Sequence, residues 1–86
     1  MPELSRFFGI SIRMYFDDHN PPHFHVEYAE QRAVVEIATG RVLAGNLPAR
    51  VRQLVEEWRR LNLRPLRAAW QEAQQGRQPR RIRPLT

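Results

Sequence analysis

The change from strand to helix is contained in residues 32–61, RAVVEIATGRVLAGNLPARVRQLVEEWRRL. At the start of this segment Ala33, Val35 and Ile37 share one face of an extended chain, as in a half-buried strand. The residues between them are Arg32, Val34 and Glu36. Pro48 suits an early helical position, and after it the apolar residues follow a helical period. They are Val51, Leu54, Val55, Trp58 and Leu61. The switch predicts an α+β fold in which strands precede helices.

The alternation extends toward the N-terminus and the helical period toward the C-terminus. Period two predicts strands at 8–16, 23–29, 32–38 and 41–44. The connections are too short for parallel crossovers, so we expect an antiparallel meander of three to four strands. A second apolar stripe that ends at Gly76 predicts a second helix. The two helices, at 48–61 and 63–75, are expected to pack on one face of the sheet.

A chain of 86 residues allows one small domain with a thin core. We therefore expect a single domain over 1–86, with the sheet and a histidine-rich loop in 1–46 and the helical pair in 47–76. The segment 77–86 is either a free basic tail or an extended segment pinned by Ile82 and Leu85. The sequence contains no cysteine, which excludes disulfides and thiolate metal sites and predicts a cytoplasmic protein. We expect no membrane contact, because the apolar stretch at 7–16 is interrupted by Arg13 and is too short to span a bilayer.

The charge of the chain is distributed unevenly. Residues 1–49 hold four arginines and six acidic residues, whereas residues 50–86 hold ten arginines and three acidic residues. Part of this charge is explained by pairs at i,i+4, such as Arg52 with Glu56. The excess without nearby acids predicts weak contact with RNA, DNA or an acidic protein partner. The residues predicted for that contact are Arg64, Arg67, Arg80, Arg81 and Arg83.

The side chains best suited to metal binding or catalysis lie in DDHNPPHFH, residues 17–25, which holds every histidine of the chain. Strand alternation places His23 and His25 on one face. With His19 or Asp17 they form a candidate site for a divalent metal such as zinc. Alternatively, His23 and His25 act as acid and base on RNA without a metal, because imidazole exchanges protons near neutral pH. The third interpretation is a structural corner in which the polar side chains satisfy backbone groups.

Motifs of the common enzyme classes are absent. The sequence has no glycine-rich phosphate loop, no serine nucleophile motif and no acid pair spaced for glycoside hydrolysis. Whether the protein is an enzyme therefore stays open at this point.

The run PELSRFFGI at 2–10, followed by IRMYF at 12–16 and HNPPHFHV at 19–26, resembles the bacterial domain of unknown function 4160 family. The family signature falls on His19, His23 and His25 together with Pro21, Pro22 and Phe24. The resemblance implies a small bacterial protein, often encoded beside a protein of the domain of unknown function 2442 family, and a C-terminal segment that belongs to the fold. It leads us to expect an interaction component of a toxin-antitoxin-like module that binds the neighbouring gene product. A small ribonuclease-type toxin and a divalent-metal-binding protein are the alternatives.

Overall fold

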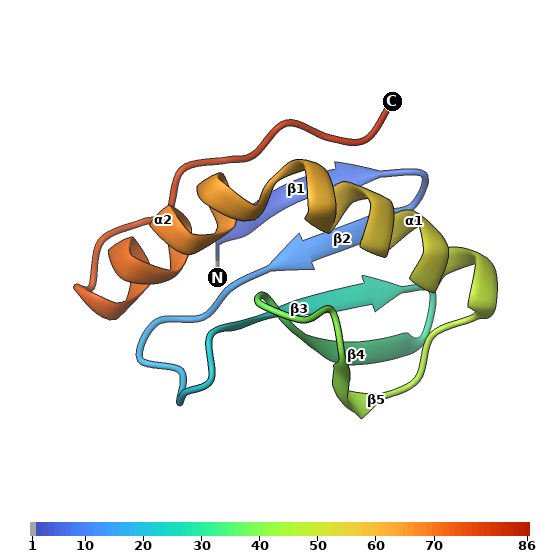
Figure 1. Ribbon diagram of the computed structural model, residues 1–86, viewed down its shortest axis with the longest axis horizontal. Helices are drawn as coiled ribbons and strands as arrows, with labels where there is room; N and C mark the ends of the chain where they lie inside the picture. The colour runs from blue at the N-terminus through green and yellow to red at the C-terminus, as the bar shows by residue number, and fades with distance from the viewer. Residues whose placement is uncertain (1) are drawn as a thin grey trace.

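The computed structural model describes residues 2–86 as a five-stranded sheet followed by two helices (Figure 1). The strands are β1 (Glu3–Phe7), β2 (Ile10–Arg13), β3 (His23–Tyr28), β4 (Gln31–Glu36) and β5 (Val42–Gly45), and the helices are α1 (Ala49–Leu61) and α2 (Leu63–Gln74). Neighbouring strands pair in chain order, and every pair is antiparallel. The α+β meander is confirmed, with five strands instead of three to four.

The first predicted strand, 8–16, is wrong at both ends. The chain forms two strands, β1 and β2, that meet at Phe8 and Gly9 with φ of 50° and 77°. Two consecutive residues with positive φ make the tight turn that suits the twist of a hairpin. The sequence pattern did not reveal this turn, because Phe8 fits the two-residue period of the strand that follows. In the structure Phe8 is instead a turn residue whose side chain is 61% exposed.

After Arg13 the chain leaves the sheet, three residues before the predicted end of the strand. Met14 is still fully buried, and its N–H donates to the carbonyl oxygen of Pro2 at 3.3 Å. Asp17 then adopts a φ of 59°, which turns the chain toward the start of β3. The segment between β2 and β3 is therefore longer than predicted, and it carries Tyr15 as well as the two aspartates.

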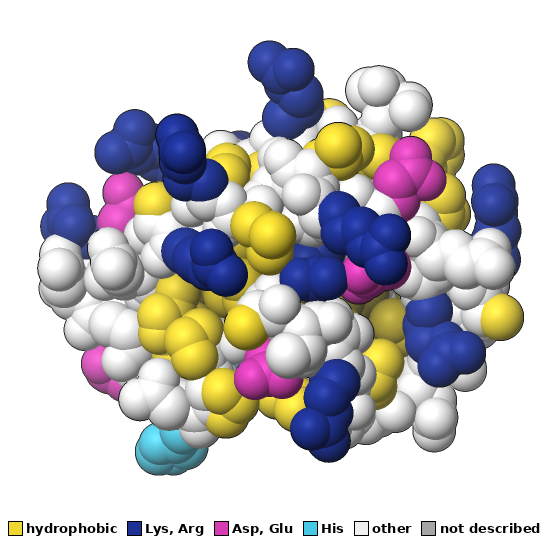
Figure 2. Space-filling model, viewed as in Figure 1, with side chains coloured by type: hydrophobic (Ala, Val, Ile, Leu, Met, Phe, Trp, Pro, Cys, Tyr) yellow, Lys and Arg dark blue, Asp and Glu magenta, His cyan; other side chains and the backbone are white. Residues whose placement is uncertain are grey.

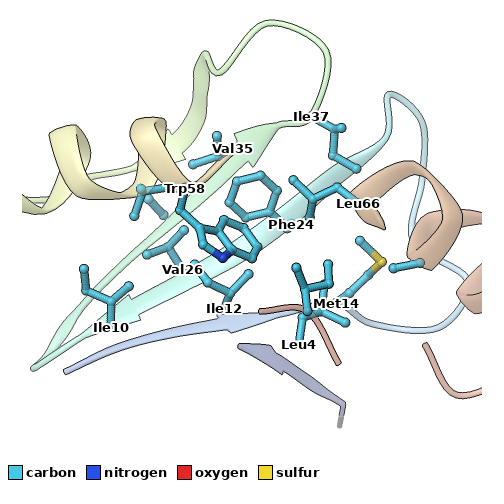
Figure 3. Close-up of a cluster of buried hydrophobic side chains, with 14 of the residues drawn as sticks. Leu4, Ile10, Ile12, Met14, Phe24, Val26, Val35, Ile37, Trp58 and Leu66 are labelled. Atoms are coloured by element: carbon cyan, nitrogen blue, oxygen red, sulfur yellow. The ribbon is translucent and has the colours of Figure 1, made fainter. Parts of the chain in front are cut away.

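The core lies between the sheet and the helices, which follow one another across one face (Figure 1). Trp58 of α1 is fully buried, with its ring centroid 5.5 Å from that of Phe7 and 5.8 Å from that of Phe24. Figure 3 shows this indole between side chains of several strands, with Met14 and Leu66 nearby. The other face of the sheet is not covered by a helix, so polar side chains of β2, β3 and β4 remain accessible there.

The C-terminal segment is packed and extended, as the second alternative for 77–86 proposed. The N–H of Ile82 donates to the carbonyl oxygen of Leu4 at 2.7 Å, and the indole N–H of Trp58 donates to that of Arg83 at 2.8 Å. Ile82 and Leu85 are both buried. The segment thus runs back along β1 and covers that edge of the sheet, while β5 forms the opposite edge with every residue exposed (Figure 1).

Arg59 joins α1 to the end of β4. Its buried guanidinium group donates to the carbonyl oxygen of Ile37 at 2.7 Å and to the carboxylate of Glu56 at 2.7 and 2.8 Å. Hydrogen bonds from Arg59 and Arg60 hold the pKa of Glu56 below its ordinary value, and the same carboxylate raises the pKa of Arg59. The pair fixes the helix over the sheet. Neither helix has the length and hydrophobicity needed to cross a bilayer.

Candidate metal centre

One loop and one strand bring three metal-ligating side chains together: Asp18, His23 and His25. His23 and His25 are two residues apart on β3, and Asp18 reaches them from the segment between β2 and β3. That segment is attached to α2 because the side-chain amide of Gln74 donates to the carbonyl oxygen of Asp18 at 3.0 Å. Loop, strand and helix therefore all contribute to the position of the carboxylate.

The three side chains converge on one carboxylate oxygen. Asp18 Oδ2 lies 3.2 Å from Nε2 of His23 and 3.1 Å from Nε2 of His25. The side chain of His23 is 11% exposed, and those of His25 and Asp18 are each 23% exposed. The cluster is thus sheltered on the protein side yet accessible to a small ion from solvent.

The backbone determines which nitrogen of His23 carries a proton. Nδ1 of His23 lies 2.8 Å from the carbonyl oxygen of Pro21, and a carbonyl can only accept, so Nδ1 is the donor. In the neutral ring the lone pair is then on Nε2, which faces the Asp18 oxygen. With the ring neutral, two acceptors face each other at hydrogen-bond distance, and a cation between them would satisfy both. A backbone carbonyl on the other ring nitrogen is also the usual orienting partner of a metal-binding histidine.

Aromatic rings hold the imidazoles in place. The ring of Tyr15 meets that of His25 edge-on, with ring centroids 4.2 Å apart. The ring centroids of Trp70 and His23 are 5.2 Å apart. The two imidazoles are themselves 5.2 Å apart. These contacts restrict ring rotation, so both Nε2 atoms remain directed at Asp18.

Two imidazole nitrogens and one carboxylate oxygen form a donor set that zinc uses when a coordination position is left open. The same set serves iron and other divalent ions. Two ligand atoms at about 2.1 Å from one ion and at the tetrahedral angle stand about 3.4 Å apart, close to the distances from Asp18 to the two histidines. The nitrogen atoms of the two histidines lie within 4.8 Å of each other, so the residues present fit a divalent metal once the two imidazoles move closer together.

The structure brings together some of the residues predicted for this site and leaves others apart. His23 and His25 share one face, as the alternation predicted, but the carboxylate beside them belongs to Asp18 and not to Asp17. Asp17 and His19 are exposed and lie outside the cluster. Because neighbouring residues point in different directions, only one of the two aspartates could face the histidines, and the sequence pattern did not distinguish them.

The arginines predicted to contact nucleic acid occupy α2 and the C-terminal segment. Arg80 pairs with Glu72 at 3.3 Å, and its N–H lowers the pKa of that carboxyl. Arg81 pairs with Glu3 at 3.4 Å. Two of the five arginines thus have acidic partners, eight and 78 residues away in sequence, whereas Arg64, Arg67 and Arg83 are exposed without an ion pair in the described chain. Basic side chains are spread over the helix-bearing face and do not form one stripe (Figure 2).

Comparison with known proteins gives one result. Residues 9–71 match the family described as domain of unknown function (DUF4160), a segment that contains the complete Asp18, His23 and His25 cluster. The chain belongs to this family. No curated protein and no solved structure matches it. The matched segment of this DUF4160 protein includes the strands β2 to β5 and the helix α1, and it extends into α2.

Proposed function

We propose that this DUF4160 protein binds a divalent metal ion, with zinc as the expected ion, through Asp18, His23 and His25. The observation that carries the proposal is the convergence of both Nε2 atoms on one carboxylate oxygen, with Nδ1 of His23 committed to Pro21. Three protein ligands leave a fourth tetrahedral position open for water or a small molecule, and the metal would act as a Lewis acid toward the group bound there.

Calorimetric titration of the purified protein with zinc at pH 7.5 tests this proposal. We expect one zinc ion per chain. His25→Gln removes a direct ligand, so it should lower the zinc affinity by more than the 10- to 100-fold that is typical when a residue contacting a ligand is replaced. His19→Gln is the matched control, because His19 is exposed and lies outside the cluster. Absence of zinc binding by the wild type, or equal losses in the two variants, would refute the proposal.

A second candidate function is that of an interaction component in a toxin-antitoxin-like module of a bacterial cytoplasm. The two edges of the sheet support it, since β1 is covered by the C-terminal segment while β5 is exposed throughout. An uncovered edge strand offers unpaired backbone groups that can add a strand from a partner. The partner expected from the family resemblance is the neighbouring gene product of the domain of unknown function 2442 family.

Co-purification with that neighbouring gene product tests the interaction. Leu43→Lys changes a side chain of β5 that is 39% exposed and should weaken the complex if the partner extends the sheet. Leu61→Lys is the control, because Leu61 lies on α1 and is even more exposed, at 70%. A complex unaffected by Leu43→Lys would place the partner elsewhere, and failure to co-purify would remove this candidate.

The ribonuclease alternative uses the same two histidines differently. A histidine beside a carboxylate is an arrangement found in general acid–base catalysis, and both His23 and His25 contact Asp18. If this activity exists, expression of the wild type should halt growth, and the double change His23→Ala, His25→Ala should restore growth while the protein stays folded. Harmless expression of the wild type would count against the ribonuclease alternative and leave metal binding unaffected.

A further inference from the structure

A pocket of about 260 Å³ lies on the open face of the sheet, beside the candidate metal centre. His25 belongs to both, because its ring lines the pocket and its Nε2 contacts Asp18. Tyr15, which packs against the ring of His25, also lines the pocket. A ligand in this pocket would therefore contact a side chain that is also a candidate metal ligand.

Pairing between the strands places apolar side chains on the floor of the pocket. Val34 is the cross-strand partner of His25 on β4, and Ala44 is the partner of Val34 on β5. The side chains of directly paired residues lie on the same face of a sheet. A short apolar strip thus runs from His25 toward the edge strand, suited to the apolar body of a small organic molecule.

The charged groups of the open face leave one cation available at the pocket. Glu27 lines it, and its carboxylate lies 3.6 Å from Nε of Arg13. Glu3, on the same face, accepts a hydrogen bond from the Ser11 hydroxyl at 2.7 Å, which is the main reason that its pKa is lowered. Arg32, opposite Glu27, also lines the pocket, and its exposed guanidinium group forms no ion pair with any residue from 2 to 86.

We propose that the pocket binds a small organic oxyanion, a phosphate ester or a carboxylate, whose charged group is held by the metal and by Arg32. Its apolar body would pack on Val34, Ala44 and the ring of Tyr15. This inference rests on the proposed metal site, because the open coordination position supplies one of the two anchors. The pairing of a guanidinium group with an oxyanion is favourable because several N–H donors fit the planar or tetrahedral oxygen array.

Calorimetry on the zinc-loaded protein with phenyl phosphate and benzoate as probes tests the proposal and distinguishes the two oxyanion classes. We expect one of the two probes to bind, and only when zinc is present. If the preferred probe is phenyl phosphate, inorganic phosphate should bind more weakly, because it lacks the apolar body. Arg32→Gln should lower the affinity about tenfold or more, because it removes a charge-assisted hydrogen bond to the oxyanion. Arg50→Gln is the control, since Arg50 is exposed on α1 and is not part of the pocket.

A second variant tests the apolar floor separately. Ala44→Leu places a larger side chain in the pocket at an exposed position of β5, where the fold should tolerate it, and should abolish probe binding while zinc binding persists. Zinc binding without binding of either probe would overturn this inference alone. Equal probe affinity in the Arg32→Gln and Arg50→Gln proteins would overturn it as well. Absence of zinc binding in the first titration would refute both the metal site and the anchor that depends on it.

Discussion

Replacing Asp18 by asparagine tests the contact between Asp18 and His23 in the protein without metal. With Nδ1 of His23 donating to Pro21, the neutral ring presents a lone pair to Asp18 Oδ2 at 3.2 Å. An amide in the same place donates one N–H to Nε2 of His23 and the other to Nε2 of His25, whose ring then carries its proton on Nδ1. The variant should therefore lose zinc binding, because an amide is a poorer zinc ligand than a carboxylate, and should gain stability in the absence of zinc.

The expected gain in stability comes from the His23 contact, which changes from two facing lone pairs to a hydrogen bond, while the His25 contact remains a hydrogen bond with donor and acceptor exchanged. A net contribution of about 0.5 to 1.5 kcal/mol is typical of such a bond. For a domain of this size, 1 kcal/mol moves the midpoint of thermal unfolding by about 4 to 8 °C. Asp18→Asn should thus unfold about 2 to 12 °C above the wild type when both are measured with a chelator.

Thermal unfolding followed by circular dichroism at pH 8 with chelator measures this difference. Asp17→Asn is the matched control, because Asp17 is exposed and outside the cluster, and a surface change of this kind stays within about 0.5 kcal/mol of the wild type. If Asp18→Asn instead unfolds well below both proteins, the carboxylate stabilises the metal-free fold by itself. The reasoning from two opposed acceptors would then be refuted.

Three further predictions concern the rest of the molecule. Glu56→Gln should lower the free energy of unfolding by about 1 to 2 kcal/mol at pH 7, because it weakens the contacts with Arg59. The folded-state pKa of Glu56 is lowered from 4.5, so this difference in stability should persist above pH 4.5 and vanish as the pH falls further. Urea unfolding between pH 7 and pH 3 measures it. Ile82→Ala should cost about 2 kcal/mol in the same urea assay if the C-terminal segment is part of the cooperative fold, whereas a loss under 0.5 kcal/mol would indicate a loosely attached tail. Binding of duplex DNA or RNA through the exposed arginines of α2 and the C-terminal segment should be weak and decrease with salt by about 0.9 in log slope per phosphate contacted on DNA; affinity independent of salt in a fluorescence titration would contradict it.

The two periodicities predicted most of the fold, because burial of one face is a strong and local constraint. The helices begin and end within one residue of the predicted bounds, since Pro48 and Gly76 limit them on either side. The split of the first strand could not be predicted, because the turn depends on a positive φ at Phe8, which is unusual for a bulky residue. The strand β1 was missed with it.

The candidate site was predicted in part for a similar reason. Alternation on one strand placed His23 and His25 together, and the structure agrees. The choice between Asp17 and Asp18 depends on the path of a loop that is attached to α2 by Gln74, a contact 56 residues away in sequence. The acidic partners of Arg80 and Arg81 were missed because they do not stand at the helical i,i+4 spacing, since they lie eight and 78 residues away in sequence.

Thermal unfolding of the wild type with and without zinc, at pH 7.5 and pH 5.5, is the most direct test of the metal centre. A ligand at a hundred times its dissociation constant stabilises the native state by about 2.7 kcal/mol, which corresponds to a rise of about 11 to 22 °C in a domain of this size. We expect that rise at pH 7.5 and a much smaller one at pH 5.5, where protons compete with zinc for the imidazole nitrogens. An unchanged unfolding temperature at both pH values would contradict the assignment of Asp18, His23 and His25 as a metal site.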